Sequence, residues 1–460
     1  MAFPLEIPDR SAVSSRPHIL LVNPWIHDFA AYDFWAKPHG LLLLGGILRK
    51  AGYSISYIDC LTRFHPNAPK ADPSLRMGRG PYLKTRIPNP PGLAHIKRTY
   101  SRYGIPKEWL ISDLRTLPKP DLILVTGLMT YWYPGVQETI GVLRWEIPDV
   151  PIILGGIYAS LCPDHAHRFS GADHVVTGAG VEQILSMVNE MTGARLRLNF
   201  DPNMPDSWPI PVFDLENRSA FATLLTTVGC PYACPYCACA YLAPRLMRRS
   251  PESVVEEIDF WHHRHGIKDF VFYDDALLVG ALSHAMLIFE AVIKRNLPIR
   301  FHTPNAVHIR EITDEVATLM RGAGFKTLRL GLETASATKD RELDGKVTAN
   351  EFHRAVESLK RAGFSRDQVG AYLMLGLPGQ SIESVIESIS VVRTTGITPI
   401  LSHYTPIPHT ALWEEAVALS PYDLAADPIY TNNAIMPCRP EGFSWQTLSR
   451  LKRFATEGVL

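Results

Sequence analysis

The chain has 460 residues, with 46 basic and 46 acidic side chains and a formal net charge of zero. Its hydrophobic fraction of 46% is that of a globular protein and excludes wholesale disorder. A neutral chain is not a general nucleic-acid binder, and a length of 460 residues predicts two or three domains.

Two features of the sequence bear on its location. The longest apolar runs, such as 41–44 and 152–154, are far shorter than the roughly 18 residues of a membrane-spanning helix. The first ten residues, MAFPLEIPDR, contain acidic side chains and lack the apolar run of a secretory signal. We therefore expect a cytoplasmic protein without an integral membrane segment.

Short apolar runs alternate with helical patterns in the first part of the chain, after a loose segment (1–16). The expected strands are 18–22, 54–58, 121–126, 152–154 and 174–177, and the expected helices are 40–51, 136–145 and 181–191. This alternation predicts a doubly wound, Rossmann-like α/β sheet over 17–195. Residues 62–118 are rich in Pro, Arg and Tyr with weak periodicity, which predicts an irregular insertion.

A second α/β series follows a proline-containing linker (196–220). Its strand-like runs start near Ala222, Phe270, Ile299, Thr327, Gly370 and Pro399. Helix signals include an N-cap Ser250 followed by Pro251, and a capping box at Thr348–Glu351. Six such units predict a partial, TIM-like (β/α)6 barrel over 221–410, with functional loops at the carboxyl ends of its strands. A small helical tail is expected over 411–460.

Four of the seven cysteines lie within ten residues, directly after the first barrel strand. Three of them form the motif Cys230-Pro-Tyr-Ala-Cys234-Pro-Tyr-Cys237. Clustered thiols in a chain without an export signal indicate metal or redox chemistry rather than disulfides. Three thiolates can hold three corners of a 4Fe–4S cluster and leave the fourth iron open. The alternative is a structural zinc site with Cys239 as fourth ligand, in a non-catalytic binding protein.

This CxxxCxxC motif, with the aromatic Tyr236 before its last cysteine, resembles the motif of the radical S-adenosylmethionine (SAM) superfamily. In that family the open iron binds SAM, and one electron from the cluster cleaves SAM to a 5′-deoxyadenosyl radical. The resemblance assigns Cys230, Cys234 and Cys237 to the cluster and makes Cys239 a bystander.

The resemblance also implies SAM-binding residues at the ends of the predicted barrel strands: Tyr236, Asp274, Asp275, Glu333 and Gly376. For the two aspartates, loop solvation or helix capping is the alternative. Other side chains at the same mouth are candidates for contact with SAM or substrate: His302, Thr303, Asn305, Tyr404, Thr405 and His409.

Small residues follow three successive strands of the N-terminal series, whereas the GxGxxG and GxxxxGK(S/T) motifs are absent. Such residues leave a trench at the strand ends, where sheets of this type bind ligands. This order, upstream of the barrel, resembles the cobalamin-binding domain of cobalamin-dependent radical SAM enzymes. It implies cobalamin contacts at Thr126, Gly127, Met129, Gly155, Gly156, Thr177 and Gly178. The alternative is a domain that keeps the fold without the cofactor.

Two departures from that family concern single loops. The AspxHisxxGly signature is absent after the first strand, where the chain reads NPWIHD over 23–28, and His27 and His39 are candidates for the lower face of cobalt. Gly178-Ala179-Gly180 stands where relatives usually have Gly-Glu-Gly.

The resemblance implies a cobalamin-dependent radical SAM enzyme with a 4Fe–4S cluster, SAM and cobalamin as cofactors. The implied activity is a methyltransferase acting on an unactivated carbon or a phosphinate, and the implied reductant is a flavodoxin or ferredoxin. An alternative keeps both cofactors but performs a rearrangement or oxidative cyclisation. The substrate stays open among small molecules, lipids and peptides, and residues 62–118 and the tail are candidates for a lid.

Overall fold

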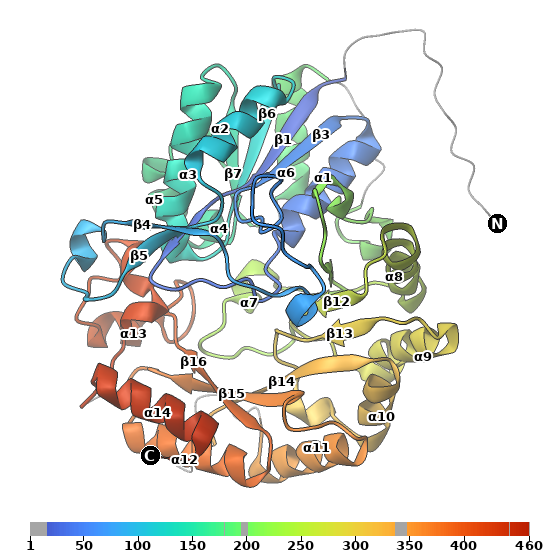
Figure 1. Cartoon of the computed structure of the whole chain (residues 1–460), viewed down its shortest axis with the longest axis vertical. Helices are drawn as coiled ribbons and strands as arrows, with labels where there is room; N and C mark the ends of the chain where they lie inside the picture. The colour runs from blue at the N-terminus through green and yellow to red at the C-terminus, as the bar shows by residue number, and fades with distance from the viewer. Residues whose placement is uncertain (1–15, 179, 195–200, 336–346, 441, 460) are drawn as a thin grey trace.

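The computed structural model describes residues 16–178, 180–194, 201–335, 347–440 and 442–459. Residues 1–15 of the expected loose segment, Ala179, residue 195 and residues 196–200 of the expected linker lie outside this part of the chain. The described residues form two sheet-based units, with the N-terminal unit above the second unit in Figure 1.

The N-terminal sheet has five parallel strands in the order β3-β1-β6-β7-β8. The strands are β1 (His18–Asn23), β3 (Ser54–Asp59), β6 (Leu122–Gly127), β7 (Ile152–Gly156) and β8 (His174–Val175). β1 and β6 are buried along their whole length, as continuous apolar runs between two helix layers must be. The strand order changes direction between β1 and β6, and such sheets bind ligands outside the carboxyl ends near this point.

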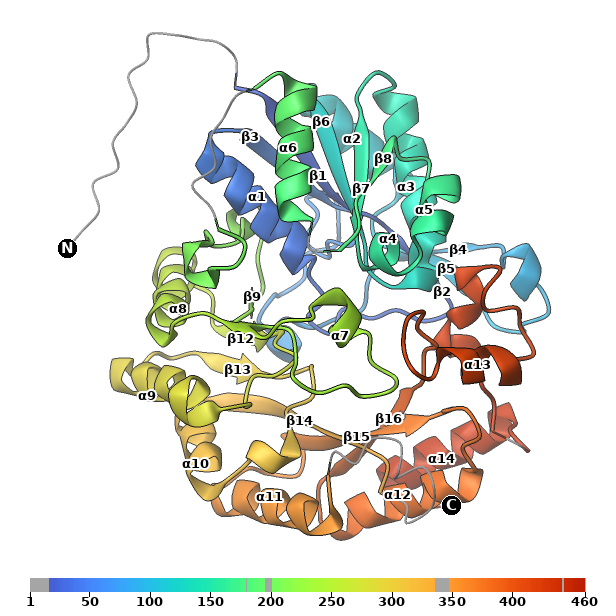
Figure 2. The ribbon, with the colours of Figure 1, turned by 180° about the vertical axis from the view of Figure 1, so that it is seen from behind.

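Helices cover both faces of this sheet, which confirms the predicted doubly wound fold. α1 (His39–Ala51) and α6 (Val181–Thr192) share one hydrophobic core on one face. The other face carries α2 (Lys107–Thr116), α3 (Tyr133–Glu146), α4 (Ile157–Leu161) and α5 (Pro163–Phe169). Figure 2 shows α1 and α6 on one side of the sheet and α3 and α5 on the other.

The region expected to be one irregular insertion contains regular elements. These are η1 (Leu75–Gly78), β4 (Lys84–Ile87), η2 (Pro91–Leu93), β5 (Tyr100–Tyr103) and α2. β4 and β5 form an antiparallel sheet with β2 (Ile26–Asp28). α2 is the crossover helix between β3 and β6, and it escapes the periodicity search because only Leu110 and Leu114 are buried in it.

The second sheet has six parallel strands in chain order, which confirms the predicted partial barrel. They are β9 (Ala222–Leu224), β12 (Asp269–Phe272), β13 (Arg300–His302), β14 (Phe325–Glu333), β15 (Val369–Leu375) and β16 (Thr398–His403). β9 and β16 do not pair with each other in the described residues, so the barrel stays open on one side. The six strands curve around a common interior below the N-terminal unit (Figure 1).

Helices on the outside of the barrel connect these strands. They are α8 (Pro251–His265), α9 (Ala285–Arg295), α10 (Asp314–Gly322), α11 (Ala349–Arg361) and α12 (Ile382–Thr394). The Ser250 side chain accepts a hydrogen bond from the Ser253 N–H, and Thr348 and Glu351 form the reciprocal pair of a capping box. Both predicted helix starts are therefore confirmed.

The C-terminal tail connects the two units. It contains α13 (Trp413–Leu419), η9 (Pro428–Thr431), η10 (Asn433–Ile435) and α14 (Trp445–Glu457). α14 packs on β16 and α12, whereas Asn432 donates to the Asp28 carboxylate of the N-terminal unit at 2.9 Å. The tail therefore holds the carboxyl edge of the first sheet against the second unit.

The segment between β2 and α1 also crosses between the units. Trp35 is fully buried and stacks on His302 of β13, with ring centroids 4.3 Å apart. The Tyr273 hydroxyl donates to the Trp35 carbonyl and accepts from the Lys37 N–H. Separately, none of the helices in the described part of the chain has the length and apolar character needed to cross a bilayer.

Candidate functional site

The thiol loop (residues 229–238) lies between β10 (Thr227–Val228) and α7 (Cys239–Leu242). β10 pairs with β11 (Met247–Arg248), so the chain enters and leaves the loop through an antiparallel pair. Gly229 has a φ of 83°, and a Cβ there would lie 2.5 Å from the Arg245 carbonyl oxygen. Only glycine fits this close approach, which fixes the start of the loop beyond the carboxyl end of β9.

None of the three motif thiols is fully buried. Cys230 and Cys234 are half-buried and Cys237 is exposed, and none of the three forms a disulfide. Partial desolvation, followed by the charges of Asp275, Cys234 and Cys230, raises the pKa of the Cys237 thiol. Neighbouring thiolates repel each other, which makes their ionisation costly. A positively charged metal centre lowers this cost because it stabilises thiolates.

The surroundings of Cys239 bear on the zinc alternative, which needs this residue as a fourth ligand. Among the described residues, no three His, Cys, Asp or Glu side chains are placed around a single metal ion. Zinc needs every sulfur about 2.3 Å from one ion, whereas a 4Fe–4S cluster takes each thiolate on a different iron. The Cys239 thiol, which the zinc alternative needs, is buried and donates to Asp275 at 3.2 Å. The Cys239 thiol is therefore engaged outside the three-cysteine motif.

A histidine that no sequence motif marks contacts the thiol loop. His308 Nε2 lies 3.8 Å from Cys230 Sγ, and the His308 ring packs against Tyr232 with centroids 4.7 Å apart. His308 is buried and lies between β13 and η7 (Ile309–Glu311). Its position beside Cys230 arises only in the fold, because 78 residues separate the two in the chain.

The two aspartates after β12 have different surroundings. Asp274 is buried, and its Oδ1 accepts bonds of 2.5–3.0 Å from the backbone and hydroxyl groups of Thr226 and Thr227. Burial raises the pKa of Asp274 to about 6, although these bonds oppose the shift. Asp274 thus anchors the strand that leads into the thiol loop. Asp275 is exposed beside Cys239, so its carboxylate is the more accessible of the two.

Two strand ends farther along the barrel have unusual backbone. Glu333, the last residue of β14, has a φ of 62°, a left-handed conformation that costs a non-glycine residue free energy and is common at functional sites. Gly376, after β15, has a φ of 90°, and a Cβ there would lie 2.9 Å from Met436 Cε. The buried Gln380, which the sequence analysis does not identify, accepts from the N–H groups of Gly376 and Leu377.

The C-terminal tail supports the thiol loop. Tyr236 packs in a cluster with Tyr404 and Leu412, and the Leu412 N–H donates to the Pro235 carbonyl at 3.0 Å. His409 is exposed and stacks on Tyr241 with centroids 4.2 Å apart. Tyr236 is therefore placed by tail residues as well as by the motif.

Three other candidates belong to the barrel wall. His302 is buried, with Nε2 2.9 Å from Asp269 and Nδ1 3.1 Å from the Thr327 hydroxyl. The Thr303 hydroxyl donates to the Thr327 carbonyl, and the Asn305 amide donates to a backbone carbonyl. Through these hydrogen bonds, the three side chains hold neighbouring strands and loops of the barrel together.

The predicted cobalamin residues lie at the carboxyl edge of β6, β7 and β8. Gly156 has a φ of 92°, and a Cβ there would lie 2.6 Å from Thr126 Oγ1 and 2.7 Å from the Gly127 carbonyl oxygen. Only glycine fits this close approach of two strand ends. Gly178 has open space where its Cβ would be, and its N–H donates to Ser160 Oγ at 2.8 Å.

Exposed apolar side chains follow the same edge. Met129 is 42% exposed and Ile157 is 40% exposed, next to the exposed Gly156, Thr177 and Gly178. Gly155 would also have room for a side chain, since its nearest neighbour is the Val176 carbonyl at 3.9 Å. An open edge with apolar side chains fits a large, flat group such as a corrin.

The two histidines considered for cobalt are used elsewhere. His27 Nε2 lies 2.7 Å from Glu138, and His39 Nδ1 lies 2.8 Å from the Thr223 hydroxyl of β9. Burial lowers the pKa of His39 to about 3, so it stays neutral near pH 7. His39 therefore joins α1 to the barrel.

The carboxyl ends of the two sheets meet. The Tyr131 side chain, in η3 (Thr130–Trp132) after β6, lies beside Thr405, which follows β16. Thr130 Oγ1 lies 3.1 Å from Thr431 Oγ1 of the tail. The edge that carries the N-terminal trench therefore lies against the mouth of the barrel (Figure 1).

Comparison with known families agrees with this geometry. The family model of the radical SAM superfamily matches residues 224–392, from the end of β9 into α12. The barrel therefore contains a region, residues 224–392, that matches the radical SAM family model.

Relatives and solved structures extend the comparison to the N-terminal sheet. An uncharacterized methyltransferase of Pyrococcus horikoshii is 26% identical over 348 residues, covering 68% of this chain and 74% of the relative. The anaerobic magnesium-protoporphyrin IX monomethyl ester cyclase of Rubrivivax gelatinosus is 23% identical over 336 residues, covering 65% of this chain and 59% of the cyclase.

The radical S-adenosylmethionine methyltransferase TsrM of Kitasatospora setae, determined with cobalamin and a 4Fe–4S cluster bound, has a TM-score of 0.63 at 16% identity. The match covers 88% of this chain and 76% of TsrM. Both units together therefore share the fold of TsrM.

Proposed function

We propose that the protein is a cobalamin-dependent radical SAM methyltransferase that acts on an unactivated carbon or a phosphinate. The observation that carries this proposal is the meeting of two sites on one chain. The trench of the first sheet and the thiol loop of the second unit both follow carboxyl strand ends, and the Tyr131–Thr405 contact brings these edges together. A methyl carrier and a radical source placed this way would face a common substrate.

Each cofactor has its own set of proposed residues. Cys230, Cys234 and Cys237 hold the cluster, and Tyr236, Asp275, Glu333 and Gly376 contact SAM, while Asp274 places the loop. Thr126, Gly127, Met129, Gly155, Gly156, Thr177 and Gly178 line the cobalamin trench. When bound, the cluster and SAM supply a carbon-centred radical and cobalamin supplies a methyl group. The chain divides accordingly into 17–195, a linker, 221–410 and the tail.

The residues of the chain orient these groups and exclude water. Asp274 fixes the strand before the thiol loop through Thr226 and Thr227. The tail closes one side through Asn432, whose amide donates to the buried Asp28. A closed, positioned site of this kind protects a reactive radical from side reactions.

The test is anaerobic purification with iron, sulfide and corrin quantified together. We expect about four irons and one cobalamin per wild-type chain. Cys234→Ala should lose iron and SAM cleavage but keep corrin, whereas Gly156→Val should lose corrin but keep iron. Cys162→Ala, in a half-buried cysteine outside the motif, should keep both. Four irons without corrin after reconstitution with cobalamin would remove the methyl carrier from the proposal.

A second function keeps both cofactors without methyl transfer. The similarity to the magnesium-protoporphyrin ester cyclase, at 23% identity, favours this alternative. Product mass separates the two, because methylation adds one methyl unit and a cyclisation or rearrangement does not.

We also propose a small reductant protein such as a flavodoxin or ferredoxin as electron donor, and a small molecule, lipid or peptide as substrate. None of the seven cysteines forms a disulfide, which favours a reducing compartment, and we therefore propose that the protein is cytoplasmic.

A further inference from the structure

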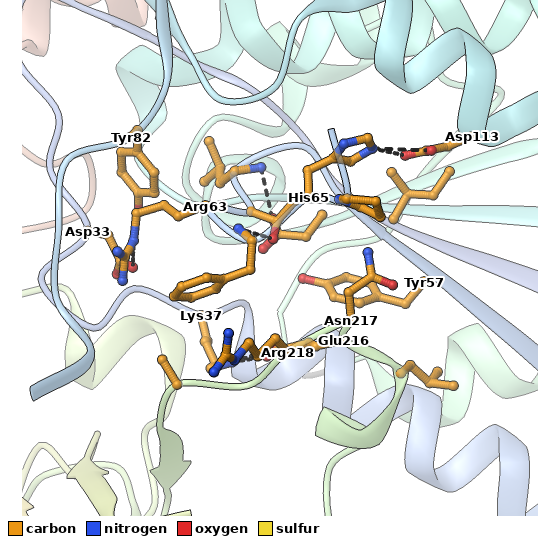
Figure 3. Close-up of a pocket in the computed structure, with 18 of the residues that line it drawn as sticks. Asp33, Lys37, Tyr57, Arg63, His65, Tyr82, Asp113, Glu216, Asn217 and Arg218 are labelled. Atoms are coloured by element: carbon orange, nitrogen blue, oxygen red, sulfur yellow. Dashed lines mark hydrogen bonds and ion pairs between the residues drawn. The ribbon is translucent and has the colours of Figure 1, made fainter. Parts of the chain in front are cut away.

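A separate pocket of about 260 Å³ lies at the carboxyl end of β3, beside the residues that precede β9 (Figure 3). Its volume corresponds to roughly nine water molecules. Asp59, Tyr57 and Arg63 line it from the N-terminal unit, and Arg218 and Phe221 line it from the segment that precedes β9. Neither the motif cysteines nor the trench residues belong to its lining.

Two cations in this pocket already have anionic partners. Lys37 pairs with Glu216, and Arg63 pairs with Asp33 at 2.8 Å. Both pairs are nearly enclosed by protein, so each is an internally neutral part of the wall.

Asp59 has no such partner. Its Oδ1 accepts from the Asn23 amide at 2.7 Å and from the Leu61 N–H at 2.9 Å, and its Oδ2 receives no bond from the described residues. Burial, with a further contribution from Glu216, raises the pKa of Asp59 to about 6. The carboxylate therefore leaves one negative charge in the pocket that the described side chains do not neutralise.

Two tyrosine hydroxyls in the same lining lack partners as well. The hydroxyls of Tyr57 and Tyr82 are buried and make no hydrogen bond with any described residue. Tyr82 as a whole is only 7% exposed. Figure 3 shows the Tyr57 ring extending toward the middle of the pocket. Asp59 belongs to the same lining, so the carboxylate and the two hydroxyls share one cavity. Burial is the main reason that both hydroxyls have raised pKa values.

Buried polar groups without partners are costly, and a ligand that supplies partners would remove that cost. A primary ammonium group has three donors and one positive charge. It therefore matches one carboxylate oxygen and two hydroxyl oxygens. A metal ion is a poorer match, since the described residues contain no group of three His, Cys, Asp or Glu placed for one.

The rim of the pocket carries a positive charge, in contrast to the negative charge of Asp59 inside it. Arg218 lines it, is exposed, and forms no ion pair with a described residue. A guanidinium in this state is suited to a carboxylate, which it binds with two parallel hydrogen bonds.

We propose that this pocket binds a small zwitterion of free amino-acid size, with its ammonium group on Asp59, Tyr57 and Tyr82 and its carboxylate on Arg218. This site is separate from the proposed radical site, because Phe221 precedes β9 whereas the thiol loop follows it. The inference stands without the proposed function, since none of its residues is assigned to the cluster, SAM or cobalamin.

The test is ligand-observed NMR with the purified holoenzyme and each of the twenty protein amino acids in turn. For the tightest binder, two matched probes are then added, the amine without the carboxylate and the acid without the amine. We expect the amino acid to bind, the amine to bind at least tenfold more weakly, and the acid not to bind. Absence of binding by all twenty would overturn the proposal, as would equal binding of the acid.

Matched variants locate the binding site. Asp59→Asn should weaken binding at least tenfold, and Tyr82→Phe should weaken it severalfold while leaving the ring in place. Asp113→Asn is the control, because this pocket-lining carboxylate already contacts His65 at 3.1 Å. Arg218→Met should lower the affinity for the amino acid to that of the amine probe, because the carboxylate then has no partner. Unchanged binding in folded Asp59→Asn and Tyr82→Phe proteins would overturn the assignment.

Discussion

The barrel mouth and the N-terminal trench hold their loops in different ways. At the barrel mouth, buried side chains bond to backbone groups, as Asp274 does to Thr226 and Thr227 and as Gln380 does to Gly376. At the trench, the close approach of Gly156 to Thr126 and Gly127 sets the shape. A small cluster needs ligands fixed to within fractions of an ångström, whereas a large corrin needs an uncovered edge. The contrast therefore predicts different sensitivities to mutation.

The largest effect should come from the anchor of the thiol loop. Asp274→Ala leaves two buried backbone N–H groups and two hydroxyls without their acceptor, which should lower the free energy of unfolding by about 4 kcal/mol. Asp274→Asn keeps an oxygen acceptor and should lose much less. Urea unfolding gives the stabilities, and iron content shows whether the loop still holds the cluster. Equal losses in the two variants would show that charge, not the acceptor, matters.

The aspartate at the end of β3 should be visible in the pH dependence of stability. The pKa of Asp59 is raised from 3.8 to about 6, so the native state holds this proton more tightly than the unfolded state. Its contribution is therefore full below about pH 4 and is lost as the pH rises through 6, by about 3 kcal/mol. Asp59→Asn should remove this part of the slope in unfolding measured between pH 4 and pH 7. An unchanged slope would contradict the burial of an uncompensated charge.

The trench should show a smaller effect that depends on position. Gly156→Ala adds a Cβ within 2.7 Å of two atoms at a φ of 92°, which should cost about 2 kcal/mol and reduce corrin content. Gly178→Ala is the matched control, because its φ of 67° is also positive but its Cβ would meet open space. Thermal unfolding and corrin content, measured side by side, distinguish the two. Equal effects would mean that strain, rather than close approach, controls the trench.

The sequence predicts the features of these two regions that local patterns determine, but not those that only packing brings together. The barrel strands, the cap at Ser250 and the cysteine spacing are local patterns, so the chain order alone reveals them. The sequence does not predict α2, because few of its residues are buried and its apolar periodicity is weak. The weak periodicity of residues 62–118 likewise gives no signal for β4 and β5. His308 and Gln380 were missed because their partners are brought to them only by packing. Likewise, the pocket around Asp59 combines residues from both units, which no local pattern connects.

The smallest expected effect concerns the contact between His308 and the thiol loop. Hydrogen bonds to cluster sulfurs stabilise the more negative, reduced state, so removing one lowers the reduction potential. His308→Leu removes the group that lies 3.8 Å from Cys230 Sγ, and should shift the potential to more negative values by on the order of tens of millivolts. An anaerobic redox titration followed by electron paramagnetic resonance measures this shift.

The control for this experiment is His409→Leu. His409 stacks on Tyr241 of α7, the helix that follows the thiol loop, and its ring partner among the described residues is this tyrosine rather than a cysteine. Its variant should keep the wild-type potential. A purely structural role for His308 would lower iron content without moving the potential of the remaining cluster, whereas the proposed bond predicts a shifted potential at unchanged iron content. The measurement therefore determines whether the barrel mouth tunes its cofactor as well as holding it.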